Sequence, residues 1–102
     1  MSEEEAVSAI DELLVGDQSI PGKLAMKKGI DEEAVARLES AIETLMPIYK
    51  VRNDIPKKVA AAFLDLAADF DRTMPLYSSE LQDRIEDLKL HIISLGYDLF
   101  GS

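Results

Sequence analysis

The sequence predicts an all-α protein: a bundle of four main helices and a candidate short helix, in a single domain over residues 1–102. Apolar residues recur every three or four positions along most of the chain, and no segment alternates as a strand does. The last segment, residues 79–100, shows an unbroken heptad pattern, which is typical of a helix packed lengthwise against others. The heptad positions are Leu81, Ile85, Leu88, Ile92, Leu95 and Leu99.

Composition narrows the class of protein. Twenty acidic and eleven basic side chains give a net charge of −9, which repels phosphate backbones and argues against DNA or RNA as a ligand. The absence of cysteine excludes disulfides, thiolate catalysis and cysteine-based metal sites. The N-terminal residues are acidic, unlike a secretory signal, and no apolar run reaches the ~20 residues that cross a bilayer. We therefore expect a soluble cytoplasmic protein with no membrane partner.

The first helix is expected over residues 2–15. Ser2 is a good N-cap, and three glutamates follow in the first turn, where the helix dipole favours them. Gly16 supplies a C-terminal stop. Residues 17–30 leave two interpretations open: a short helix that Ser19 caps, with a proline in its first turn, or an irregular loop over the bundle.

Two further helices are expected in the middle of the chain. Asp31 caps the first, and Pro47 predicts its end or a kink near Met46. Its apolar positions are Val35, Leu38, Ile42, Leu45 and Tyr49. Asp54 caps the second, with Pro56 in the first turn. Its apolar positions are Val59, Phe63, Leu66 and Phe70, and the alanines beside them allow a neighbouring helix to approach closely.

A turn over residues 71–77 is expected before the last helix, which a capping box of Ser79 and Gln82 begins. Three expected helix starts share a capping residue, an apolar residue and a proline: Ser19-Ile20-Pro21, Asp54-Ile55-Pro56 and Thr73-Met74-Pro75. Common helix-start chemistry explains this similarity. A degenerate solenoid of helical hairpins is the alternative, although the unequal spacing of the prolines counts against it.

Some of these segments resemble a small archaeal family of uncharacterised, acidic helical proteins. The resemblance rests on two short elements and on the alanine-rich helix before the second, residues 59–70. The elements are Asp17-Gln18-Ser19-Ile20-Pro21 and Met74-Pro75-Leu76. The middle of the chain, residues 31–55, is longer than in that family, and Asp71-Arg72-Thr73 replaces the family's Asn-Asp turn. The resemblance covers about half of the chain and implies a helical fold but no activity.

No group of residues has the spacing of a catalytic, cofactor-binding or metal-binding site. His91 is the only histidine. Asp87 and Asp98 share its polar strip on the last helix, and a carboxylate one turn from an imidazole can hold a divalent metal. One histidine without cysteine makes a poor ligand set, and the other acidic residues fall on polar helix faces or in caps rather than in a dry cleft. We therefore expect no metal, no cofactor and no enzyme activity.

Two basic clusters interrupt the acidic surface. They are Lys23, Lys27 and Lys28, and Lys50, Arg52, Lys57 and Lys58. Both lie in or near the connections on either side of the helix that Asp31 begins. If they meet in space, they form a weak anion or RNA site. Otherwise they are solvated loop residues, and lysines near a helix C-terminus favour that interpretation.

The last helix carries a second apolar stripe, formed by Leu90, Ile93, Tyr97 and Phe100. Either a second copy covers this stripe across a two-fold axis, or the helix is central and its own chain, including the segment Ile20–Met26, covers both sides. We expect the first arrangement, because two aromatic and two aliphatic side chains suit an interface core. The predicted function is a non-enzymatic helical interaction or assembly module that forms a homo-oligomer or docks a protein partner. The alternatives are an acidic immunity or inhibitor protein that covers a basic partner, and a weak RNA or anion binder.

Overall fold

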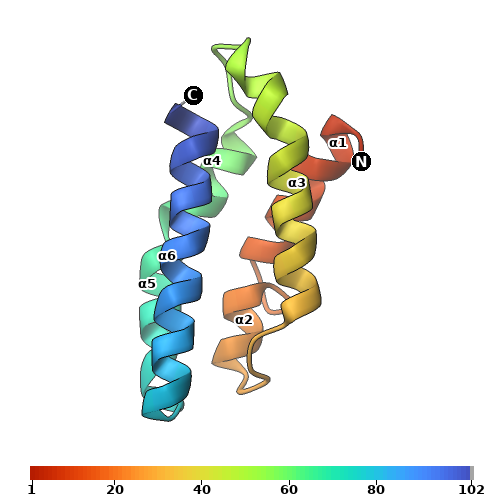
Figure 1. Ribbon diagram of the computed structural model, residues 1–102. Helices are drawn as coiled ribbons and strands as arrows, with labels where there is room; N and C mark the ends of the chain where they lie inside the picture. Colours follow the sequence, from red (N-terminus) through yellow and green to blue (C-terminus); the bar gives the residue numbers. More distant parts are fainter. Residues whose placement is uncertain (102) are drawn as a thin grey trace.

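The described part of the chain is helical and contains no strand, which confirms the predicted fold class (Figure 1). The computed structural model describes residues 1–101. Its elements are α1 (Glu3–Leu14), α2 (Ile20–Ala25), α3 (Glu32–Lys50), α4 (Lys57–Leu64), α5 (Leu66–Thr73), the 3₁₀ turn η1 (Met74–Leu76) and α6 (Ser79–Gly101).

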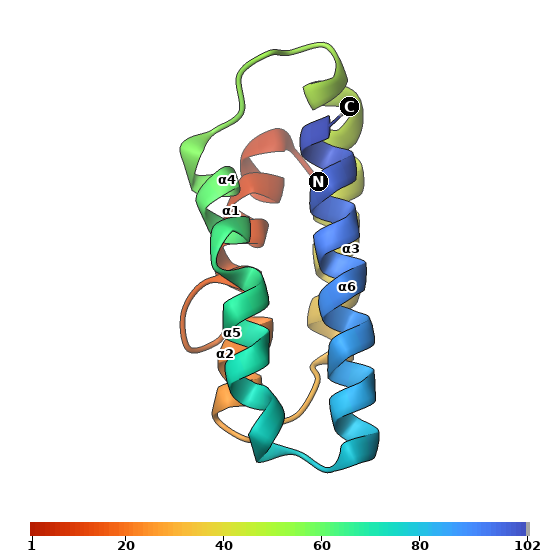
Figure 2. The same cartoon turned by 90° about the vertical axis from the view of Figure 1, so that its left-hand side faces the viewer.

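The helices form two layers in a molecule of 43 × 21 × 20 Å. The long helices α3 and α6 lie side by side and run in the same direction (Figure 1). In the other layer, α1 packs against α3 and α4, and α5 packs against α6 and α2 (Figure 2). The core lies between the layers. Its largest fully buried side chains are Ile10, Leu14, Ile20, Leu24, Leu38, Ile42, Leu45, Leu66, Phe70, Ile85, Ile92 and Leu99.

The predicted caps of the first three helices are confirmed. Ser2 and Glu5 form a capping box, in which each side chain accepts a 3.1 Å hydrogen bond from the backbone N–H of the other. Ser19 Oγ accepts from the N–H of Gly22 at 3.0 Å, so residues 20–25 form the short helix rather than the irregular loop. Asp31 Oδ1 accepts from the N–H of Ala34 at 3.0 Å.

Pro47 does not end its helix, so of the two predicted alternatives the end near Met46 is wrong and the kink stays a prediction. α3 continues to Lys50. Pro47 lies in the last turn, where its missing N–H removes a single hydrogen bond, the one to the carbonyl of Glu43. The packing of the buried Leu45 and Tyr49 on the same face outweighs that loss.

The predicted helix after Asp54 differs in two ways. Asp54 caps nothing: α4 begins after Pro56, which makes no side-chain cap, and Asp54 Oδ1 lies 3.7 Å from Nε of Arg52. The expected single helix is also divided at Asp65 into α4 and α5. The division lets α4 follow α1 while α5 follows α2, and it leaves Leu64 80% exposed at the bend.

The predicted turn and the predicted capping box before the last helix are both wrong in part. α5 extends to Thr73, so the predicted turn over residues 71–77 is shorter and is largely the 3₁₀ turn η1. Ser79 and Gln82 form no capping box. Ser78 Oγ instead accepts weakly, at 3.4 Å, from the N–H of Leu81. The Gln82 side chain is engaged elsewhere, because its Nε2 donates to the carbonyls of Met74 and Tyr77 and closes η1.

The heptad positions of α6 do face the core, but unequally. Ile85, Ile92 and Leu99 are at most 1% exposed, whereas the three leucines that alternate with them are only half-buried. At 100° per residue, successive heptad positions differ by about 40–60° around the helix, so one member of each pair faces the centre of the core and the other turns toward the edge of the layer. Within residues 1–101, no helix is long and apolar enough to span a bilayer.

Candidate interaction surface

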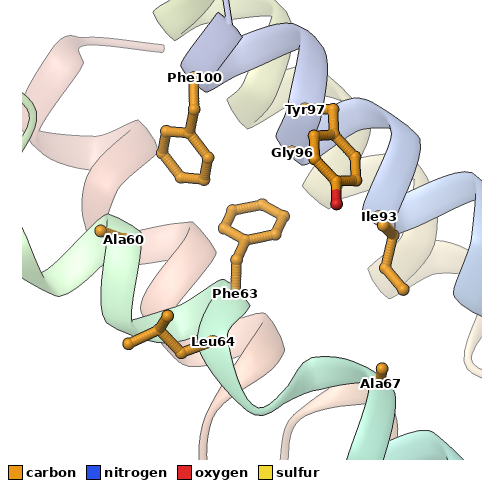
Figure 3. Close-up of a pocket in the computed structure, with 8 residues that line it drawn as sticks. All are labelled: Ala60, Phe63, Leu64, Ala67, Ile93, Gly96, Tyr97 and Phe100. Atoms are coloured by element: carbon orange, nitrogen blue, oxygen red, sulfur yellow. The ribbon is translucent and has the colours of Figure 1, made fainter.

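A shallow groove separates α4 and the start of α5 from the C-terminal half of α6. Its volume is about 380 Å³. Figure 3 shows the residues that line it: Ala60, Phe63, Leu64, Ala67, Ile93, Gly96, Tyr97 and Phe100. We call it the α4–α6 groove. None of these side chains carries a charge, and the Tyr97 hydroxyl is their only polar side-chain atom.

An aromatic contact on a glycine closes the floor of the groove. The ring of Phe63 lies directly on Gly96, so close that a Cβ built on Gly96 would lie 2.8 Å from Phe63 Cδ1. The same ring meets Phe100 edge to face, with ring centroids 5.3 Å apart and planes at 90° (Figure 3). This contact fixes the two aromatic side chains between the helices and leaves Leu64 and Tyr97 on opposite rims.

The rims are unusually exposed for apolar residues. Leu64 is 80% exposed and Tyr97 76%. Leu90, which continues the stripe one turn toward the start of α6, is 54% exposed, and Phe100 is 37% exposed. Four of the nine exposed large hydrophobic residues in the described chain therefore gather around this one groove. Together with the groove, Leu90 completes what we call the apolar face.

The structure locates the stripe predicted from the sequence and adds a second wall to it. Leu90, Tyr97 and Phe100 are exposed, and Ile93 is half-buried at the groove. The segment expected to cover them in the central-helix alternative, now α2, packs against α5 and α1 instead. The α4 wall was not foreseen. Its only signal was the alanine content, which indicated close helix approach but not a groove.

At the end of the apolar face nearer the start of α6, a lysine forms ion pairs that join α5 to α6. Lys89 Nζ lies 2.9 Å from both Asp71 Oδ1 and Glu86 Oε2, and the lysine side chain is only 12% exposed. The hydrogen bonds to Glu86 and Asp71 raise the pKa of Lys89 above its ordinary value. Lys89 therefore connects α5 to α6 beside Leu90, at one end of the apolar face.

His91, in the predicted polar strip of α6, contacts an acidic residue on another helix. His91 Nε2 lies 3.1 Å from Glu39 Oε1 on α3, a partner that sequence spacing within one helix does not reveal. Within residues 1–101, no group of three or more histidine, cysteine or acidic side chains has an arrangement that could hold a metal ion. The expectations of no metal, no cofactor and no catalysis stay predictions.

The two basic clusters lie at opposite ends of the molecule, at α2 and at the end of α3 (Figure 1). Several of their members pair with nearby acids. Lys23 Nζ lies 2.6 Å from Asp31 Oδ2, and Arg52 Nη1 lies 2.8 Å from Glu3 Oε2. The clusters therefore do not combine into one anion site.

No protein-family model, curated protein or solved structure matches this chain. The resemblance to the archaeal family of acidic helical proteins stays a prediction.

Proposed function

We propose that this protein is a non-enzymatic assembly module that self-associates through the apolar face. The observation that carries the proposal is the exposure of Leu64 and Tyr97 on opposite rims of one uncharged groove. A monomer seldom exposes a continuous apolar surface of this kind, and such surfaces mark interaction sites. Tyrosine and phenylalanine are also enriched in interface cores.

The chemistry of the groove favours a protein ligand over a small molecule. A small-molecule site needs a few convergent polar groups to orient its ligand, and the α4–α6 groove offers a single hydroxyl. Ridges of leucine and aromatic side chains beside a line of alanines are instead suited to the packing of another helix. A second copy supplies such a helix, and a two-fold contact buries the face on both copies at once.

Light scattering at micromolar concentration tests this proposal. The wild-type chain should have about twice the monomer mass of 11.3 kDa. Tyr97→Glu and Leu64→Glu place a charge on either rim and should give monomers with unchanged helical circular dichroism. Val51→Glu is the matched control, since Val51 is 86% exposed at the end of α3 and does not line the groove.

Two results would contradict the proposal. The first is a wild-type chain that remains monomeric at the highest concentration measured. The second is a dimer that survives Tyr97→Glu and Leu64→Glu as well as it survives Val51→Glu, because the contact would then lie elsewhere.

A further inference from the structure

Opposite charges flank the apolar face at its two ends. On α4, Lys57 precedes Ala60 by three residues and Leu64 by seven, so all three share one side of the helix. On α6, Asp87 precedes Leu90 by three residues and lies just beyond the other end of the stripe, beside Asp83 and Glu86. Lys57 and Asp87 are both exposed.

The contacts between the helices place these charges along one axis. Asp71 meets Lys89, and Phe63 meets Gly96, so α4 and α5 run antiparallel to α6. Lys57 lies six residues before Phe63, so it lies beyond Phe63 in the direction of the C-terminal end of α6. Taking 1.5 Å per residue along α6, Asp87 lies about 12 Å from the middle of the Leu90–Phe100 stripe, and Lys57 lies on the opposite side of that middle.

We infer that the second copy docks on the apolar face in an antiparallel, two-fold arrangement in which Lys57 of each copy pairs with Asp87 of the other. This inference rests on the proposed self-association and specifies its geometry. A two-fold axis through the middle of the stripe, perpendicular to α6, exchanges the two ends of the face. It brings Leu90 opposite Phe100 of the second copy, and it brings the basic end opposite the acidic end.

Charge selects this arrangement over the parallel one. A two-fold axis along α6 would set Asp83 and Asp87 against the same two residues of the second copy, in a chain whose net charge is already −9. Like charges in register across an interface oppose association. The antiparallel arrangement separates the two acidic ends and gives each of them a lysine.

Charge reversal tests the pairing. At low salt, Lys57→Glu and Asp87→Lys should each raise the Kd of the dimer roughly tenfold. Each change puts two like-charged pairs in one dimer. An equimolar mixture of the two variants should regain an affinity within about threefold of the wild type, since the mixed dimer has two opposite-charged pairs. Lys28→Glu is the control, because it makes the same charge change in the connection after α2, outside the face.

Disulfide cross-linking tests the direction of the two chains, because the protein has no cysteine of its own. Ser94 lies beside the centre of the stripe, so Ser94→Cys should form an intermolecular disulfide on oxidation. Asp83 lies twelve residues before the centre, so its two copies are about 36 Å apart in the antiparallel dimer and Asp83→Cys should form none. In a parallel dimer, both variants cross-link.

The outcomes separate this inference from the proposed function. A wild-type monomer overturns both. A wild-type dimer whose affinity is not restored in the mixture, or which cross-links through Asp83→Cys, overturns the antiparallel pairing and leaves self-association standing. The antiparallel pairing is supported if the mixture regains the wild-type affinity and if Ser94→Cys forms the cross-link while Asp83→Cys does not.

Discussion

His91 Nε2 on α6 lies 3.1 Å from Glu39 Oε1 on α3. One heptad earlier on both helices, Arg84 Nη2 lies 3.0 Å from Glu32 Oε1. Because both contacts have the same offset along the two helices, α3 and α6 are parallel and keep a constant register over at least two turns. Parallel neighbours in a chain need a connection that returns to the starting end, and α4 and α5 supply it.

These charged contacts should mark the register without adding much stability. Their side chains are between 43% and 69% exposed, and exposed ion pairs contribute about 0–1 kcal/mol. We expect Glu39→Gln to change the free energy of unfolding by less than about 0.5 kcal/mol in urea titrations at neutral pH. A loss of more than about 2 kcal/mol would indicate a desolvated pair and would contradict this account.

The parallel pair should owe its stability to the buried positions of α6. Ile92 is 0% exposed, so Ile92→Ala removes core contacts and leaves a cavity, at a cost of about 2–5 kcal/mol. Val51→Ala is the control, and because Val51 is 86% exposed its effect should stay within about 0.5 kcal/mol. Urea unfolding of both variants measures the difference. Equal losses would place Ile92 outside the core.

The parts of the fold that sequence reasoning predicted are those that depend on local chemistry. Ser2, Ser19 and Asp31 each accept a hydrogen bond from a backbone N–H in the first turn of their own helix, and this requires no knowledge of distant residues. The apolar periodicity of α1, α3 and α6 is also local, and their buried residues follow it.

The parts that it missed depend on tertiary contacts. The bend at Asp65 follows from α4 and α5 packing on different helices, and no glycine or proline marks it. Gln82 bonds to η1 rather than to a cap because η1 folds back over it. The same limit applies to the groove. The α6 stripe is visible as a period in one helix, but its second wall exists only because Phe63 reaches Gly96 across the layers.

The cap of α3 should make stability depend on acid pH. Two hydrogen bonds lower the pKa of Asp31 below its ordinary value of 3.8. The larger effect comes from the bond that Lys23 donates to Oδ2, and the next from the bond that the N–H of Ala34 donates to Oδ1. A carboxyl with a lowered pKa in the folded state stabilises the fold above the ordinary value, and this contribution is lost as the pH falls through the folded-state pKa.

The thermal midpoint should therefore fall as the pH is lowered below about 4. Asp31→Asn retains a capping side chain but has no charge to lose, so its midpoint should be lower at pH 7 and should fall less steeply in acid. Asp54→Asn is the control, because Asp54 caps no helix and its side chain is 89% exposed. Parallel acid slopes for Asp31→Asn and the wild type would show that other groups dominate.

Gly96 should resist replacement by alanine although it lies inside a long helix. Alanine is favoured over glycine by about 1 kcal/mol in a helix interior, but the new Cβ would lie 2.8 and 2.9 Å from Cδ1 and Cε1 of Phe63. The ring cannot simply retreat, because it is also packed edge to face against Phe100. We expect overpacking to win, with a net loss of about 1–2 kcal/mol in the free energy of unfolding.

A second substitution and a second glycine make this prediction specific. In a Phe63→Leu background, the added methyl should cost less than in the wild type, and a double-mutant cycle measures the coupling between the two positions. Gly101→Ala is the matched control, because a Cβ there meets nothing within 4 Å. If Gly96→Ala proves more stable than the wild type, helix propensity outweighs the contact and Phe63 is free to move away from α6.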